Sequence, residues 1–137
     1  MNILFMCVHN SARSQMAEAL AREIIPAANV QSAGSNPSGR VHPAVFEVLK
    51  AIDVDSNLLK SKSMDDLPKE FLDKLDLIIT LCADEICPSM VTQAKILHWP
   101  MPDPSKENNH DLVFLAFAEV RDQIKEKIEK LKEEDGL

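Results

Sequence analysis

A cysteine and an arginine separated by five residues are the first side chains in this 137-residue chain that could carry out chemistry together. A loop that leads into a helix can present successive backbone amides to an anion. An arginine adds a planar, bidentate clamp for an oxyanion, and both features favour the thiolate of a nearby cysteine. We therefore predict that Cys7 is a nucleophile at an oxyanion-binding loop. The loop residues after it are Val8, His9, Asn10, Ser11, Ala12, Arg13 and Ser14.

Two side chains inside this loop suit such a role. Asn10 tolerates a left-handed backbone conformation, which helps a tight loop without glycine. Ser14 could donate its hydroxyl to the thiolate of Cys7. The alternative is an ordinary buried cysteine at a strand end, because a cysteine and an arginine at this spacing also occur by chance.

The elements that must position the loop alternate along the chain. The apolar run at 2–6 predicts a strand, and a helix over 14–25 is predicted by its good helix formers. Further strands are predicted at 29–33, 75–81 and 95–99, and further helices at 43–52, at 64–74 with an interruption at Pro68, and along the apolar stripe from 113 to 131. Strands separated by helices predict one α/β domain over 1–137, a doubly wound sandwich with four parallel strands and a phosphate-binding loop after the first.

Ligands of such folds bind outside the carboxyl ends of the strands. Three stretches are therefore expected at one edge of the sheet, namely those after Met6, Leu81 and Trp99. Cys7, Cys82 and Asp103 lie in these stretches.

Composition excludes several classes of protein. The formal net charge is −7, which argues against a binder of nucleic acid or of anionic membranes. No apolar run approaches the roughly 20 residues of a membrane span, and no signal peptide is apparent, so we expect a cytoplasmic protein. Three cysteines is an odd number for a disulfide framework and favours reactive or metal-bound thiols.

The sequence resembles the low-molecular-weight tyrosine phosphatase family, and within it the thioredoxin-coupled arsenate reductases. The resemblance runs nearly from end to end. The matching segments are Cys7-x5-Arg13-Ser14, Gln15-Met16-Ala17-Glu18, Ser32-Ala33-Gly34, Thr80-Leu81-Cys82, His98-Trp99 and Asp103-Pro104.

The late Asp-Pro pair supplies a candidate proton donor. When a thiolate attacks a tetrahedral oxyanion, the oxygen that leaves needs a proton, which a carboxylic acid can provide. The resemblance implies that Asp103 is this acid. A loop aspartate that starts a turn before proline is the alternative.

The resemblance also implies a relay of three cysteines. Cys7 would bind arsenic, Cys82 would attack Cys7 and release arsenite, and Cys87 would attack Cys82, leaving a redox-active Cys82–Cys87 disulfide for thioredoxin. Two alternatives remain open. Cys82 could be a core thiol, or Cys82, Cys87 and His98 could bind zinc, although their spacing fits zinc poorly.

The expected substrate is small and inorganic. The chain has no tyrosine, and Ser105-Lys106-Glu107 follows Asp103-Pro104 where tyrosine phosphatases of the family usually carry aromatic residues. We therefore expect a monomeric arsenate reductase that binds phosphate as a mimic of arsenate. The rivals are a phosphatase with the same nucleophile and acid, and a non-enzymatic sensor of oxyanion or arsenite.

The resemblance also suggests a site for a potassium ion. Some reductases of this type hold potassium through an asparagine, a glutamate, a serine and an aspartate. Asn10, Glu18 and Ser32 match three of these ligands, and the aspartate would lie near Asp65. No other bound cofactor is expected. His9 is expected to face solvent, with tuning of the local charge in the loop as the alternative. Arg40 and His42 are expected at the surface, with the border of the pocket as the alternative.

Overall fold

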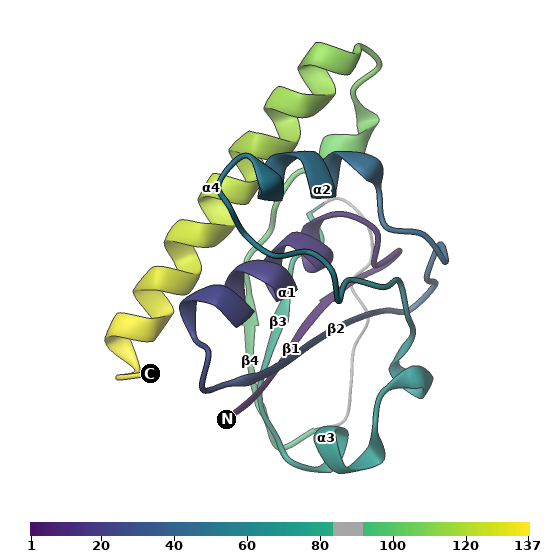
Figure 1. Cartoon of the computed structure of the whole chain (residues 1–137). Helices are drawn as coiled ribbons and strands as arrows, with labels where there is room; N and C mark the ends of the chain where they lie inside the picture. The colour runs from purple at the N-terminus through teal and green to yellow at the C-terminus, as the bar shows by residue number, and fades with distance from the viewer. Residues whose placement is uncertain (84–91) are drawn as a thin grey trace.

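Four parallel strands form a single sheet in the order β2-β1-β3-β4 (Figure 1). The structure is a computed structural model and describes residues 1–83 and 92–137. The strands are β1 (Asn2–Cys7), β2 (Asn29–Gly34), β3 (Leu75–Thr80) and β4 (Lys95–His98). Each lies within one residue of its predicted bounds, and the predicted parallel α/β sheet is confirmed.

The helices of the described segments also follow the prediction closely. They are α1 (Arg13–Ile24), α2 (Pro43–Lys50), α3 (Lys69–Asp73) and α4 (His110–Glu134), with short 3-10 helices η1 (Met64–Asp66) and η2 (Pro104–Lys106). The predicted helix over 64–74 is divided into η1 and α3 at Pro68, because proline lacks the amide that a helix interior needs.

Strand β1 is buried on both faces of the sheet, which explains its unbroken apolar sequence. Ile3 and Phe5 pack in the core with α1, α2 and α4. Leu4 and Met6 face the opposite side, where Phe71 of α3 covers the sheet. Figure 1 shows α1, α2 and the long α4 together on one side, so helices lie on both faces as the doubly wound fold requires.

Helix α4 binds the core through the stripe that its sequence predicts. Phe117, Val120, Ile124, Ile128 and Leu131 are all buried. Arg121 is also buried, and its Nη1 donates a hydrogen bond of 2.7 Å to the carbonyl of Val48 in α2.

Of the described helices, none is long and apolar enough to cross a membrane.

The sheet order places the end of β1 between the ends of β2 and β3. Cys7 pairs with Gly34 of β2, and Met6 pairs with Thr80 of β3. The next strand in sequence, β2, lies on one side of β1, and the strand after it, β3, lies on the other side. Cys7 therefore lies where the strand order reverses, which is the point where ligands bind in open α/β sheets.

Candidate active site

The loop after β1 turns its carbonyl groups outward. The carbonyls of Val8, His9 and Ser11 accept hydrogen bonds from the amides of residues 36, 38 and 42, at 2.9, 3.0 and 2.8 Å. The carbonyl of Asn10 accepts one from Gln15 Nε2 at 2.9 Å. A planar trans peptide points its N–H opposite to its carbonyl, so the amides of residues 9–12 point to the inside of the loop. This arrangement forms the predicted anion cradle at the N-terminus of α1.

The thiol of Cys7 lies buried at the entrance to this loop and contacts a hydroxyl. Its Sγ is 2.9 Å from Oγ of Ser14, as the sequence suggested. Asn10 Nδ2 donates to the same Oγ at 2.8 Å. Asn10 is fully buried with φ at +48°, the left-handed conformation that its residue type permits. The hydroxyl of Ser14 is therefore oriented by an amide donor, which favours donation of its own proton to sulfur.

Arg13 joins the loop to the segment that leads to Asp103. Its side chain is buried, and Nη1 donates to the carbonyl of Met101 at 2.9 Å and to that of Leu81 at 3.5 Å. The ends of β3 and of the following segment are thereby held against the start of α1.

Asp103 is half-buried, and its carboxylate caps the next short helix. Its Oδ1 accepts hydrogen bonds from the amide and the hydroxyl of Ser105, at 3.0 and 2.6 Å. Its charge also reaches the imidazole of His42. Because the amide of His42 donates to Ser11 of the loop, Asp103 lies on the loop's side of the molecule. Both the turn-forming and the acid roles are compatible with this position.

His42 is half-buried and borders a hollow beside the loop, which was the alternative to the surface position that the sequence favoured. Its Nδ1 accepts a hydrogen bond of 3.1 Å from the amide of Ala44 and so caps α2, and its ring packs on Phe117 with centroids 4.6 Å apart. Burial lowers the pKa of His42, Asp103 opposes the shift, and Arg40 adds to it. The residue type before Pro43 could have indicated this cap, since proline favours the first helical position.

A hollow of about 400 Å³ adjoins the loop. Its lining residues are Ser11, Ser38, Arg40, His42 and Pro43. Arg40 is exposed, as expected, and adds a cation at the rim. His9 is also exposed, and its Nδ1 lies 3.2 Å from the carbonyl of Asn36.

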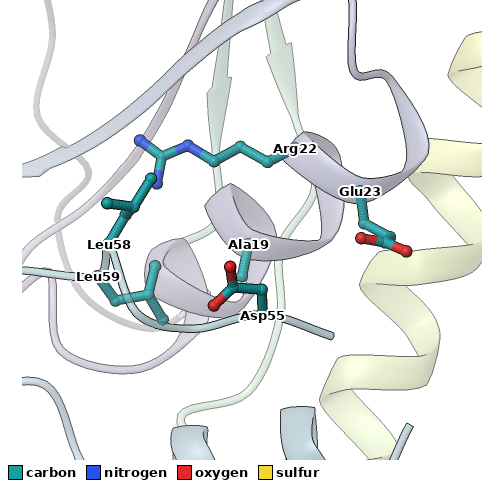
Figure 2. Close-up of a pocket in the computed structure, with 6 residues that line it drawn as sticks. All are labelled: Ala19, Arg22, Glu23, Asp55, Leu58 and Leu59. Atoms are coloured by element: carbon teal, nitrogen blue, oxygen red, sulfur yellow. The ribbon is translucent and has the colours of Figure 1, made fainter. Parts of the chain in front are cut away.

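A second hollow, of about 210 Å³, is lined by residues of α1 and of the segment around Leu58. Figure 2 shows these lining residues. None of its lining residues belongs to the loop after β1, so this hollow is separate from the thiol site.

Cys82 is buried and lies just beyond the end of β3. Cys87 lies outside the described residues. His98 contacts Thr80, with Nδ1 and Oγ1 2.6 Å apart. Within 1–83 and 92–137, no group of three or more His, Cys, Asp or Glu side chains could hold a metal ion. The zinc alternative also needs Cys87, so it is not tested by these residues.

The three expected potassium ligands converge, but a lysine accompanies them. Asn10 Nδ2 donates to Ser32 Oγ, and that hydroxyl donates to Glu18 Oε1, both at 3.0 Å. Lys62 Nζ lies 3.0 Å from the same carboxylate oxygen. Asp65, near which the fourth ligand is expected, is exposed on η1. The sequence reasoning missed Lys62 because nothing local distinguishes it from the other lysines.

The fold and the cysteine loop define a class of protein. The chain belongs to the low molecular weight phosphotyrosine protein phosphatase family, which matches residues 2–135. Within this class, arsenate reductase 1 of Bacillus cereus is 36% identical over 134 residues, covering 96% of this chain and 93% of the relative. The crystal structure of an arsenate reductase from Archaeoglobus fulgidus has a TM-score of 0.78 at 29% identity and covers 94% of this chain and 97% of that one. A thioredoxin-dependent arsenate reductase of Corynebacterium glutamicum has a TM-score of 0.72 at 28% identity, over 96% of this chain and 60% of that chain.

Proposed function

We propose that this protein reduces arsenate to arsenite with a relay of cysteines, using thioredoxin as the electron donor. The observation that carries the proposal is a second buried cysteine near the first, since Cys7 ends β1 and Cys82 lies just beyond the end of the adjacent strand β3. A phosphatase that hydrolyses its phosphocysteine with water needs only the first of them. The similarity to proteins named arsenate reductase supports the same conclusion.

The register brings these two cysteines to the same edge of the sheet. Met6 pairs with Thr80, and the amide of Leu81 donates to the carbonyl of Met6 at 3.0 Å, so the pairing extends to Cys7 and Leu81. Cys82 follows one residue beyond. A disulfide accepts Cα separations of up to about 6.8 Å, so the relay requires the segment after β3 to hold Cys82 this close to Cys7.

The first half of the cycle forms a covalent adduct. Arsenate binds to the inward amides of the loop and to Arg13, and the thiolate of Cys7 attacks arsenic. One arsenate oxygen leaves as water after Asp103 supplies a proton. Ser14 stabilises the thiolate before the attack.

The second half transfers two electrons. The thiolate of Cys82 attacks the sulfur of Cys7, the S–As bond breaks, and its electron pair stays on arsenic, which leaves as arsenite. Cys87 then attacks Cys82, frees Cys7 and leaves a Cys82–Cys87 disulfide. Thioredoxin reduces this disulfide with two electrons and two protons. A reducing compartment such as the cytoplasm suits the cycle.

A coupled assay tests the function. Arsenate, thioredoxin, thioredoxin reductase and NADPH are mixed with the protein, and we expect steady NADPH consumption that requires arsenate, thioredoxin and Cys7. Hydrolysis of an aryl phosphate without any thiol requirement, and without NADPH consumption, would instead identify a phosphatase. Binding of oxyanion or arsenite with neither reaction would identify a sensor.

A further inference from the structure

A fully buried carboxylate lies beneath the loop after β1. Glu18, in α1, has no exposed surface. A carboxylate taken out of water is costly unless a cation and hydrogen bonds compensate for it. Its Oε1 accepts two hydrogen bonds of 3.0 Å, one from Ser32 Oγ and one from Lys62 Nζ. The ammonium group of Lys62 thus binds the same carboxylate oxygen of Glu18 as Ser32, which belongs to the hydrogen-bond network of the loop.

Lys62 is itself held to this network by its backbone. Its amide donates to Asn10 Oδ1 at 2.8 Å, and its carbonyl accepts from the amide of Gly34 at 3.0 Å. Its side chain is only 12% exposed, and Nζ also donates to the carbonyl of Lys60 at 3.3 Å. Hydrogen bonds therefore hold both the backbone of Lys62 and its Nζ atom, and together they fix the ammonium group at Glu18.

Hydrogen bonds continue from this ion pair to the thiol. They run from Ser32 Oγ to Glu18, from Asn10 Nδ2 to Ser32, and from Asn10 Nδ2 to Ser14, whose Oγ contacts Cys7. The position of the Glu18 carboxylate thus decides how the amide of Asn10 is oriented, and Asn10 holds the loop in its left-handed turn.

The residues around Glu18 do not fit a potassium ion. Asn10 turns its Nδ2, a donor, toward Ser32, while its Oδ1 accepts from Gln15 and from the Lys62 amide. A potassium ion needs oxygen ligands, and here it would meet an ammonium group on the same carboxylate oxygen. Like charges at that distance repel strongly in a buried site.

We propose that the ammonium of Lys62 is the built-in monovalent cation of this loop, and that Lys62 is a positioning residue that makes oxyanion binding independent of potassium. The inference rests on the proposed function only in taking residues 7–14 as an oxyanion-binding loop. Arg22 does not replace Lys62. Its Nη1 lies 3.0 Å from Glu18 Oε2, but that oxygen accepts no hydrogen bond from any described residue. Figure 2 shows the Arg22 side chain at the rim of the open hollow beside α1.

The test compares the wild type with Lys62→Ala in potassium chloride and in choline chloride of equal ionic strength. The measurements are the dissociation constant of inorganic phosphate by calorimetry and the Tm. We expect the wild type to give the same values in both salts. We expect Lys62→Ala to bind phosphate about tenfold more weakly in choline. Potassium or methylammonium, entering the space that the side chain leaves, should restore most of this loss.

The matched control is Lys60→Ala, which removes a neighbouring lysine whose side chain does not contact Glu18. It should behave as the wild type does. The inference is overturned if wild-type binding responds to potassium as strongly as Lys62→Ala does, if the two lysine variants behave alike, or if no cation reduces the loss in Lys62→Ala.

A second pair of variants covers the case in which Lys62→Ala fails to fold. In a Glu18→Gln background no buried charge needs a cation, so adding Lys62→Ala should change the phosphate dissociation constant by less than about threefold. A further tenfold loss would contradict the inference. These readouts need no arsenate reduction. A wild type that binds phosphate but does not reduce arsenate would therefore contradict only the proposed function and not this inference.

Discussion

Ser14 makes the closest described side-chain contact of the Cys7 thiol, and its role can be tested directly. A hydrogen bond to a charged group contributes about 1.5–3 kcal/mol, so Ser14→Ala should slow the reaction of Cys7 at neutral pH by about 10- to 100-fold. The readout is the rate of alkylation by iodoacetamide in a Cys82→Ser/Cys87→Ser background. Ser35→Ala removes an exposed serine outside the loop and serves as the control. An unchanged rate in Ser14→Ala would mean that its hydroxyl only supports the loop.

Asp103 carries two roles that one substitution separates. Asp103→Asn keeps an oxygen that can accept from Ser105, so the turn before η2 should persist. It removes the acidic proton, so the arseno-cysteine adduct should form about 10²–10⁴-fold more slowly in rapid-mixing experiments. Phosphate should still bind. A normal rate of adduct formation would leave Asp103 with the capping role only.

At the scale of elements, the end of β2 and the loop after β1 are packed so closely that only glycine fits between them. A Cβ atom on Gly34 would lie 2.5 Å from the carbonyl oxygen of Val8 and 3.0 Å from Asn10. These neighbouring atoms belong to the backbone or to a buried side chain, so a Cβ atom at residue 34 would force the loop itself to move.

Gly34→Ala should therefore lower the free energy of unfolding by about 1–3 kcal/mol and weaken phosphate binding in parallel. Urea unfolding and calorimetry measure the two effects. Ser35→Ala, at the next and exposed position, should leave both unchanged. Normal phosphate affinity in a destabilised Gly34→Ala protein would show that the loop does not depend on this contact.

The cap of α2 should make stability depend on pH. Burial lowers the pKa of His42 below its ordinary value of 6.5, so between the folded and the unfolded pKa the unfolded state binds a proton that the folded state does not. The free energy of unfolding should therefore fall as the pH drops through about 6.5, because proton binding then stabilises the unfolded state. Protonation of Nδ1 would also break its bond to Ala44.

His42→Asn keeps a capping acceptor but does not titrate. Between about pH 7.5 and pH 5.5, the wild type should lose more stability than this variant does in urea unfolding. Equal losses in the two proteins would show that His42 does not contribute to the pH dependence.

At the scale of the whole molecule, patterns local in sequence predicted what local physics determines. The strand–loop–helix unit around Cys7, the break at Pro68 and the buried stripe of α4 all follow from apolar spacing and from proline. Lys62 and His42 could not be placed in this way. Their roles depend on contacts with Glu18 and Phe117, which are 44 and 75 residues away. The convergence of Asn10, Glu18 and Ser32 was predicted, but a fourth position set by tertiary packing could not be.

The central claim joins Cys7 to Cys82 and Cys87, a pair that lies far along the chain from it, in one ordered relay, and Cys87→Ser tests this claim most directly. This variant should complete one turnover with arsenate and then stop with Cys7 and Cys82 joined. Mass spectrometry of a non-reduced digest should show the Cys7–Cys82 bridge in a yield that matches the arsenite released. Arsenite release without this bridge, or a Cys7–Cys87 bridge as the main product in the wild type, would contradict the account.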